Sequence, residues 1–272
     1  MALPPASDSS TALVTGASSG IGQAFAHGLA RRGHGVTLVA RGAEGLAAVA
    51  AELEREHGVR ADFVAADLAD PDQRDELAAE VERRGRTVEV LVNAAGFGVY
   101  SPIVESDRAQ ELQQIRLLVE AVVDLATRYL PGMVERGRGA VINVSSTSGL
   151  QPLPYNAGYA AAKVYLSFWN DAVSSELRGT GVTTTAVIPG PVKTGFQEAS
   201  GADYFADRLP GFTFKSAERV AEDGLRAAER GKRSIIPGGP LVRLAYGPNR
   251  FAPRFLQLLV ARRLMKPPAA AG

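Results

Sequence analysis

A glycine-rich segment near the N-terminus, Thr15-Gly16-Ala17-Ser18-Ser19-Gly20-Ile21-Gly22, constrains the fold of this chain more than any other feature. It follows a β-branched run at 11–15, typical of a strand, and opens a helical pattern at 21–32. A glycine trio alone can be a tight turn. Its position between a strand and a helix instead predicts a dinucleotide-binding loop.

Each glycine of this loop has a separate physical task. Gly16 permits the sharp turn, Gly20 lets the backbone approach a pyrophosphate, and Gly22 lets the helix pack closely on the strand. The N–H groups at the start of the helix are then available to an anionic phosphate. The cofactor contacts expected in this loop are Gly16, Ser18, Ser19, Gly20, Ile21 and Gly22.

Strand-like and helix-like patterns alternate along the rest of the 272 residues. This alternation predicts an α/β protein with a doubly wound Rossmann-like fold, whose seven-stranded, mostly parallel sheet has helices on both faces. Ligand should bind beyond the carboxyl ends of the strands. The expected strands are 11–15, 36–40, 61–66, 88–93, 140–145, 182–188 and 234–237, and the expected helices are 21–32, 44–57, one opening at Pro71, 108–134, 155–177 and 217–230.

The same patterns divide the chain into three parts. We expect a flexible arm at 1–10, a single domain at 11–239 with a substrate lid at about 195–215, and a basic amphipathic extension at 240–272. The first ten residues lack the basic start and long apolar run of a signal peptide. No window offers the roughly 18 apolar residues that a membrane-spanning helix needs.

Composition narrows the functional class. Hydrophobic residues make up 46% and charged residues 22%, as in ordinary globular proteins. The chain has no cysteine, which excludes disulfides, thiol catalysis and cysteine-based zinc sites and favours a reducing compartment. The formal net charge of +1 lacks the strong excess of basic residues that is typical of nucleic-acid-binding proteins. We therefore expect a cytoplasmic protein without a nucleic-acid partner.

The glycine spacing, Gly-x-x-x-Gly-x-Gly, resembles that of the short-chain dehydrogenase/reductase family, and the resemblance extends over about residues 11–237. Asp67-Leu68 is similar to the family's pair beside the adenine ring, although Asp67 can also cap the following helix. Asn93-Ala94-Ala95-Gly96 is similar to the family's Asn-Asn-Ala-Gly motif, with Ala94 in place of the second Asn. The resemblance implies cofactor contacts from Asp67, Leu68, Asn93, Ala94 and Gly96, although a loop that supports the sheet is the alternative for the second segment.

The end of the second expected strand indicates which dinucleotide binds. NAD-binding folds usually place an acid there for the ribose 2′-hydroxyl, and this chain has Ala40 followed by Arg41. A guanidinium can hold a 2′-phosphate through charge-assisted hydrogen bonds. Arg41 can also be a solvated loop residue. The resemblance, with Ser18 close enough to assist, implies NADP(H) rather than NAD(H).

Tyr159 and Lys163 are one helical turn apart and share a face of an expected helix. An ammonium near a phenol, aided by the charge of oxidised nicotinamide, lowers the pKa of the phenol and suits it to proton transfer. Lys163 can also hold the nicotinamide ribose hydroxyls. Such a pair in isolation is common on solvated helix surfaces, so its interpretation depends on the residues around it.

A serine at the end of the fifth expected strand completes the catalytic set. A hydroxyl there can donate to a substrate oxygen as negative charge develops. Ser145 and Ser148 lie near enough to be alternatives to Ser146. Any of the three can also serve only to form hydrogen bonds with backbone groups of the loop. The family's interval between serine and tyrosine matches Ser146 and Tyr159 best. We expect Ser146, Tyr159 and Lys163 to be catalytic.

A proline- and glycine-stiffened turn follows the sixth expected strand, Pro189-Gly190-Pro191-Val192-Lys193-Thr194. The resemblance implies that this turn holds the nicotinamide carboxamide, with Thr194 as the main contact. A plain turn is the alternative. The cofactor contacts expected here are Pro189, Gly190, Val192 and Thr194.

One position departs from the family pattern. The family places an asparagine in the long helix before the fifth strand, where it holds a water that feeds protons to the lysine, and here Leu118 takes that place. A leucine cannot perform this polar role. Gln114, one turn earlier, lies on the same face and is a possible substitute.

The lid and the tail bear on the substrate and on partners. Aromatic residues in the lid favour a hydrophobic carbonyl or alcohol substrate, unless they only pack the lid onto the body. They are Phe196, Tyr204, Phe205, Phe212 and Phe214, opposite Leu150, Leu153 and Tyr155. The tail at 241–266 mixes apolar residues with Arg243, Arg250, Arg254, Arg262, Arg263 and Lys266. It can pack over the active site or on a partner subunit, or lie on an anionic membrane surface.

These motifs together predict an NADP(H)-dependent carbonyl reductase or alcohol dehydrogenase. Hydride passes between nicotinamide and substrate, Tyr159 exchanges the proton, and Ser146 polarises the oxygen. The alternative is an NADP(H)-binding sensor or scaffold with weak catalysis, supported by Leu118. A nucleotide-sugar epimerase is disfavoured, because that branch usually needs a longer C-terminal domain and another glycine spacing. The resemblance also implies a homo-oligomer.

Overall fold

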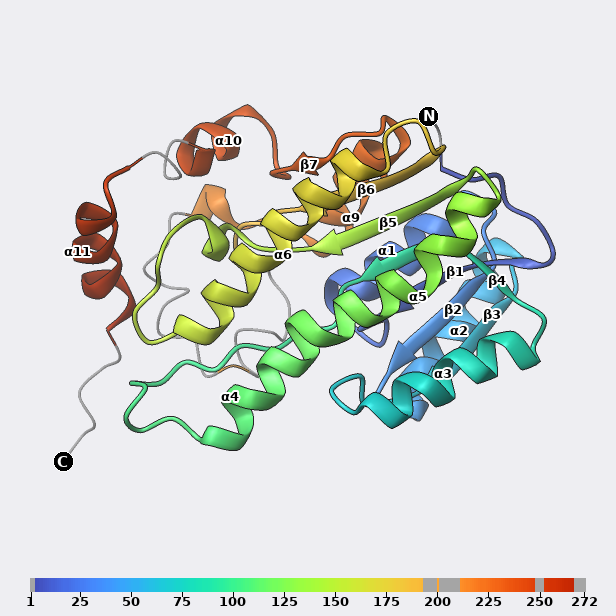
Figure 1. The fold of residues 1–272 in the computed structure, drawn as a ribbon, viewed down its shortest axis with the longest axis horizontal. Coiled ribbons are helices and arrows are strands. Elements are labelled where there is room, and N and C mark those ends of the chain that lie inside the picture. Colours follow the sequence, from blue (N-terminus) through green and yellow to red (C-terminus); the bar gives the residue numbers. More distant parts are fainter. Residues whose placement is uncertain (1–2, 193–199, 201–210, 248–251, 267–272) are drawn as a thin grey trace.

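The computed structural model describes residues 3–192, 200, 211–247 and 252–266. Within them the strands form one seven-stranded parallel sheet in the order β3-β2-β1-β4-β5-β6-β7, which confirms the predicted doubly wound α/β fold (Figure 1). The strands are β1 (Ser10–Thr15), β2 (Val36–Ala40), β3 (Ala61–Ala65), β4 (Thr87–Asn93), β5 (Gly139–Val144), β6 (Val182–Val187) and β7 (Ser234–Ile235). The winding reverses between β1 and β4, which leaves a crevice at their carboxyl ends.

Helices cover both faces of the sheet. One layer packs α1, α2 and α9 on a core that includes Phe25, Leu46 and Leu225. The opposite layer packs α3, α5 and α6 on a core that includes Leu77 and Leu125. The helices are α1 (Gly20–Ala30), α2 (Ala43–His57), α3 (Pro71–Arg83), α4 (Arg108–Ile115), α5 (Ala121–Glu135), α6 (Ala157–Glu176), α9 (Ala217–Glu229), α10 (Pro240–Tyr246) and α11 (Arg254–Met265).

Most observed boundaries lie within one or two residues of the predicted ones, and the differences have local causes. The helix expected from 155 begins at Ala157, because Tyr155 has a φ of 66° that cannot continue into a right-handed helix. The helix expected at 108–134 is interrupted by a π-helical turn, Arg116–Glu120, between α4 and α5. Such turns insert one extra residue and redirect the side chains that follow.

The structure adds detail to the arm expected at 1–10 and to the helix cap considered at Asp67. Ser10 belongs to β1, and Arg60 Nη1 donates to the backbone oxygen of Asp8 at 2.7 Å, so the arm expected at 1–10 is anchored at its end. The N-cap of α3 is Asp70, whose carboxylate accepts from Asp72 N at 3.0 Å, and it is not Asp67. Pro71 then occupies the first turn, where its missing N–H costs nothing.

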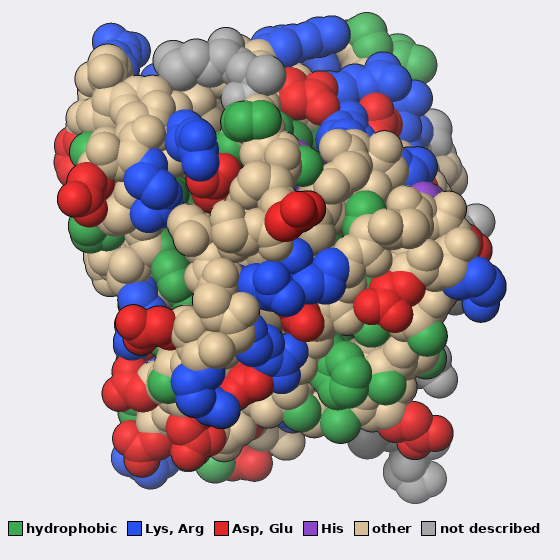
Figure 2. Space-filling model, turned by 90° about the vertical axis from the view of Figure 1, so that its right-hand side faces the viewer, with side chains coloured by type: hydrophobic (Ala, Val, Ile, Leu, Met, Phe, Trp, Pro, Cys, Tyr) green, Lys and Arg blue, Asp and Glu red, His purple; other side chains and the backbone are tan. Residues whose placement is uncertain are grey.

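Charged side chains at the amino ends of the strands are largely paired with one another. Asp62 accepts from Arg60 at 2.9 Å and from Arg86 at 3.2 Å, and the buried Glu89 pairs with Arg138 at 2.8 Å. Figure 2 shows this end of the molecule, where side chains of both signs alternate over the surface. The opposite end, beyond the carboxyl ends of the strands, carries α11 (Figure 1). No helix in the described ranges is long and apolar enough to cross a membrane.

Candidate active site

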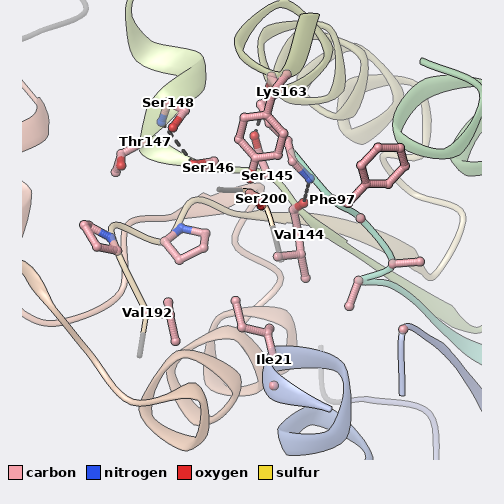
Figure 3. Close-up of a pocket in the computed structure, with 18 of the residues that line it drawn as sticks. Ile21, Phe97, Val144, Ser145, Ser146, Thr147, Ser148, Lys163, Val192 and Ser200 are labelled. Atoms are coloured by element: carbon pink, nitrogen blue, oxygen red, sulfur yellow. Dashed lines mark hydrogen bonds between the residues drawn. The ribbon is translucent and has the colours of Figure 1, made fainter. Parts of the chain in front are cut away.

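A cavity of about 950 Å³ lies at the carboxyl ends of the central strands (Figure 3). Its walls come from the glycine loop, the segments that follow β2 to β6, the first turns of α6, and α11. The predicted site residues that line it are Gly16, Ser18, Ser19, Gly20, Ile21, Gly22, Arg41, Asp67, Leu68, Ala94, Gly96, Ser146, Tyr159, Lys163, Pro189, Gly190 and Val192. The structure therefore brings nearly all of them to one space.

The glycine loop forms a close backbone cradle. Gly16 has a φ of 66°, and a Cβ there would lie 2.8 Å from Ala95 Cα. A Cβ on Gly22 would collide with the carbonyl oxygen of Gly16, so only glycine lets α1 start this close to β1. Among the described residues, Ser19 at the N-cap makes no capping bond and the first turn of α1 holds no acid. The N–H groups and positive end of α1 can thus receive an anion from the cavity.

Arg41 follows β2 at the rim of the cavity. Its side chain is exposed, lines the cavity with Ser18 and Gly42, and makes no hydrogen bond or ion pair within the described ranges. Ala40, where an acid would hold a ribose 2′-hydroxyl, has no polar group. A cation without a carboxylate partner at this place suits a phosphate group.

The segments after β3 and β4 differ in what they offer the cavity. Asp67 lines it, and its carboxylate accepts from Ala69 N at 3.0 Å and Gln113 Nε2 at 3.4 Å. Asn93 does not line it: its Nδ2 donates to Asn143 Oδ1 at 2.9 Å inside the sheet. Its predicted cofactor contact has no support in this arrangement, because Asn93 is still in β4 and points to a neighbouring strand.

The small residues that follow Asn93 do face the cavity. Thr15 Oγ1 accepts from the backbone N–H groups of Ala94 and Ala95, each at 3.0 Å, which ties this loop to the glycine loop. A Cβ on Gly96 would lie 2.8 Å from Leu118 Cδ2, the end of a side chain, so a larger residue there would require Leu118 to move. Phe97, which sequence reasoning did not identify, also lines the cavity.

The catalytic candidates lie on α6 and on the segment after β5. Tyr159 and Lys163 are both buried on α6, and Lys163 Nζ lies 5.5 Å from the centroid of the Tyr159 ring. Lys163 Nζ donates to the backbone oxygen of Val144 at 2.7 Å (Figure 3). Ser146 forms a side-chain hydrogen bond with Tyr159, and its Oγ accepts from Ser148 N at 3.1 Å. Serine, phenol and amine therefore form one contiguous group.

The rival serine positions have other tasks. Ser145 is buried, with its Oγ bonded to the backbone oxygen of Lys163 at 3.0 Å and to Ser167 Oγ at 2.8 Å. Ser148 lines the cavity but contributes its backbone N–H to Ser146. Of the three serines, Ser146 is the one whose hydroxyl is bonded to Tyr159.

The electrostatics of the pair differ from the sequence expectation. Burial raises the pKa of Tyr159 to about 12, and the bond from Ser146 offsets only part of that rise. Burial also lowers the pKa of Lys163 to about 8. The expected lowering of the phenol's pKa by Lys163 is therefore wrong for the protein alone, because desolvation disfavours the charged form of both groups.

Leu118 lies beside Tyr159, near the position where the family has an asparagine, and makes apolar contacts. It lies in the π-helical turn, is buried, and packs against Tyr159 and Ala162. Gln114 is also buried, but its Oε1 accepts from Val99 N at 3.0 Å and its Nε2 donates weakly to Glu111 at 3.5 Å. Within the described ranges it makes no bond to Lys163 or Tyr159, so the proposed substitution by Gln114 has no support.

The wall opposite the glycine loop is mostly apolar and was only partly foreseen. Leu153 and Phe214 line it as expected, whereas Leu150 and Tyr155 do not. Thr194, Phe196, Tyr204 and Phe205 lie outside the described residues, as does the side chain of Phe212. The lining residues that sequence reasoning missed are Phe97, Tyr100, Tyr246, Leu256, Gln257, Val260, Ala261, Leu264 and Met265. Those from α11 are spaced three or four apart, and this spacing is the signal that could have revealed them.

Comparison with known proteins agrees with this geometry. The sequence profile of the family described as "short chain dehydrogenase" matches residues 10–204. A protein of Streptomyces coelicolor named "Putative ketoacyl reductase" is 36% identical over 215 residues, covering 78% of this chain and 82% of that protein. A "Very-long-chain 3-oxoacyl-CoA reductase" of Mycosarcoma maydis is 39% identical over 176 residues, covering 64% of this chain and 50% of that protein. The match thus spans about half the length of that relative.

A solved structure extends the match over nearly the whole chain. The short-chain dehydrogenase of Sphingobium yanoikuyae in complex with NADPH is 28% identical, with a TM-score of 0.78 and coverage of 96% of this chain and 97% of that one. The profile match covers well over half of the chain, and the fold and the cavity agree with it. This chain belongs to the short-chain dehydrogenase family.

Proposed function

We propose that this protein is an NADP(H)-dependent carbonyl reductase or alcohol dehydrogenase. The observation that carries the proposal is that Ser146, Tyr159 and Lys163 share one cavity with the glycine loop and Arg41. A phenol that can exchange a proton therefore lies in the same space as a cradle for pyrophosphate. The NADPH complex of the Sphingobium relative supports the choice of cofactor.

The residues present fit a dinucleotide phosphate. The cradle at Gly16 and Gly22 leaves no room for side chains, and Arg41 offers a cation without a carboxylate partner in the described ranges. We infer that the pyrophosphate binds at the start of α1, that Arg41 and Ser18 hold the 2′-phosphate, and that Asp67 and Leu68 lie beside the adenine. Ala94, Gly96, Pro189, Gly190 and Val192 would contact the remainder, with Thr194 proposed for the carboxamide.

Bound NADP(H) would supply or accept the hydride. Ser146 donates a hydrogen bond to the substrate oxygen, and Tyr159 gives its phenolic proton to that oxygen when a ketone is reduced, or accepts it in the reverse direction. Lys163, charged and within 5.5 Å of the ring, stabilises the phenolate that remains. Its bond to the Val144 oxygen fixes the direction of the amine.

The substrate we propose is a hydrophobic ketone or alcohol. Its side of the cavity is formed by Leu153, Phe214, Tyr246 and the inner face of α11, with Gln257 as a buried polar residue. An apolar wall with few polar groups selects by shape and by burial of hydrocarbon. Two similar proteins are named as reductases of ketoacyl or oxoacyl compounds, which supports a carbonyl on an apolar chain.

A sensor or scaffold with weak catalysis is the second candidate. Leu118 supports it, because an apolar side chain packs against Tyr159 where the family pattern has a polar one. The intact group of Ser146, Tyr159 and Lys163 favours an enzyme. Turnover of apolar ketones, followed by loss of NADPH absorbance, separates the two candidates.

The C-terminal part suggests contact with an anionic lipid surface. From Arg230 to the end the sequence has nine Lys and Arg residues and no Asp or Glu, while the preceding 229 residues hold 21 cations against 29 acids, a net charge of −8. The outer face of α11 exposes Phe255 at 70% and Leu259 at 53%. Apolar side chains beside cations are typical of helices that lie on membranes, and the cytoplasmic location expected from the sequence would offer an anionic leaflet.

A homo-oligomer is also part of the proposal. Exposed apolar side chains occur on two helices, with Ile115 on α4 and Tyr165 and Phe168 on α6. An apolar surface of this kind is usually covered in an assembly. The short-chain dehydrogenase family is often oligomeric, which supports the same conclusion.

The first test removes the phenolic hydroxyl. Tyr159→Phe should lower kcat for ketone reduction by about 10²- to 10⁴-fold, the usual contribution of a general acid. NADPH binding, followed by fluorescence, should change little, because the ring remains. Tyr129→Phe removes a phenolic hydroxyl on α5, outside the cavity, and is the matched control that should leave turnover unchanged. An active Tyr159→Phe enzyme would remove Tyr159 from the mechanism.

The second test concerns the cofactor. Arg41→Asp replaces a cation with an anion beside the proposed 2′-phosphate and should shift the kcat/KM ratio of NADPH to NADH by about 10- to 100-fold toward NADH. Arg178→Asp makes the same charge change at an exposed position outside the cavity and should leave the ratio unchanged. Unaltered NADPH affinity in Arg41→Asp would refute the phosphate contact.

The third test uses pH. A lowered pKa of about 8 means that Lys163 holds its proton below pH 8 and loses it above, whereas Tyr159 stays protonated up to about pH 12. The kcat/KM for ketone reduction, which reports the protonation state of the free enzyme, should therefore fall by about tenfold per pH unit above pH 8. Lys163→Arg keeps a positive charge at high pH. Its kcat/KM should therefore not fall above pH 8, even if the variant is slower overall. A wild-type profile that stays flat to pH 10 would contradict the assignment.

The fourth test is sedimentation of the full chain with vesicles. Binding should be stronger to phosphatidylserine vesicles than to phosphatidylcholine vesicles, and Arg262→Gln should weaken it by about fivefold. Phe255→Ser with Leu259→Ser should also weaken it, whereas Val104→Ser, at an exposed apolar residue elsewhere, should not. Equal binding by all variants, or a change only in oligomeric state, would exclude the lipid contact.

A further inference from the structure

A second group of chemically reactive side chains lies outside the cavity, between α1 and α2. His27 is in the last turn of α1, and Glu56 and His57 end α2. The chain has three histidines, and two of them meet here. Their rings are in edge-to-face contact, with centroids 5.8 Å apart. Neither residue belongs to the proposed reaction.

The possible ligand atoms of these three residues lie close together. Glu56 Oε2 lies 4.0 Å from His27 Nδ1 and 4.0 Å from His57 Nε2, and all three ligand atoms lie within 4.8 Å of one another. These distances are too long for hydrogen bonds. Tetrahedral zinc holds its nitrogen and oxygen ligands about 3.3 Å apart, so movements of less than about 1 Å would complete such a site.

His57 supplies an independent indication. Its Nε2 is buried and has no hydrogen-bond partner in the described ranges, and its side chain is only 16% exposed. A buried imidazole nitrogen without a partner is costly. This nitrogen lies 4.0 Å from Glu56 Oε2, and Arg55 bonds the other oxygen of that carboxylate at 3.4 Å. Glu56 Oε2 is left facing the two histidines.

We propose that His27, Glu56 and His57 bind a divalent transition-metal ion such as Zn²⁺. Two imidazoles and one carboxylate, with water in the fourth position, form a common zinc ligand set. Glu52 Oε2 lies 3.9 Å from His27 Nε2, the nitrogen that would not bind the metal, and an approach of about 1 Å would let it accept a hydrogen bond from that nitrogen. Metal-bound histidines usually have a carboxylate or carbonyl at that nitrogen.

The ion would link two helices that both begin at the cavity. α1 starts with the glycine loop, and α2 starts two residues after Arg41. The metal would join their far ends and oppose any change of angle between them. This proposal is independent of the proposed reaction, because none of its ligands lines the cavity.

The experiment uses the full chain without a histidine tag. Titration calorimetry with ZnCl₂ and visible absorption with CoCl₂ report stoichiometry and coordination, and thermal unfolding reports linkage. One equivalent of Zn²⁺ should bind, Co²⁺ should give tetrahedral absorption bands, and saturating Zn²⁺ should raise Tm by about 5 °C.

Variants assign the ligands. His27→Gln and His57→Gln should each lose the Co²⁺ bands and at least tenfold in Zn²⁺ affinity, and Glu52→Gln should weaken binding by about tenfold. Glu44→Gln removes an exposed carboxylate at the start of α2 and should bind as the parent does. Circular dichroism checks that each variant is folded. Absence of stoichiometric binding, or unchanged binding in both histidine variants, would overturn the proposal.

Discussion

The bond between the buried Lys163 ammonium and the Val144 carbonyl organises the active end of this protein. It joins α6 to the end of β5, and the bond from Ser145 Oγ to the Lys163 oxygen joins the same two elements again. Gly149 brings the loop close enough for these bonds, since a Cβ there would lie 2.8 Å from the Lys163 backbone. Because these bonds hold the helix and the loop together, they also bring Ser146 on the loop into contact with Tyr159 on the helix.

Local sequence patterns predicted the parts of the structure that depend on local constraints. The glycine loop was predicted because a close turn into a helix admits few residue types, and Tyr159 and Lys163 because the helical period places them on one face. The direction of Asn93 was not predictable, since it depends on Asn143 in another strand. The pKa of Tyr159 was misjudged because burial, a property of the whole packing, outweighs a nearby charge. Packing of the tail over the active site was one of the placements that the sequence left open, and residues of α11 do line the cavity. Which residues of α11 face it depends on contacts far apart in the sequence.

In the π-helical turn, Leu118 makes a packing contact at a position where the family has a polar residue. Leu118 lies in this turn, packs against Tyr159 and approaches Gly96 closely. An apolar side chain at this place keeps water from that side of the phenol, and burial then raises the pKa of Tyr159. The cavity offers a proton path from another direction, because both Tyr159 and Lys163 line it.

The open cradle at the start of α1 has a consequence for the protein's persistence. In the proposed complex a dinucleotide would satisfy the helix N–H groups there and the cation at Arg41, so its binding would favour the folded state by mass action. A hundredfold excess over Kd contributes about 2.7 kcal/mol. The rate at which proteases degrade such a protein would then depend on the cellular concentration of the dinucleotide. A fall in that concentration would shorten the protein's lifetime even without any change in substrate.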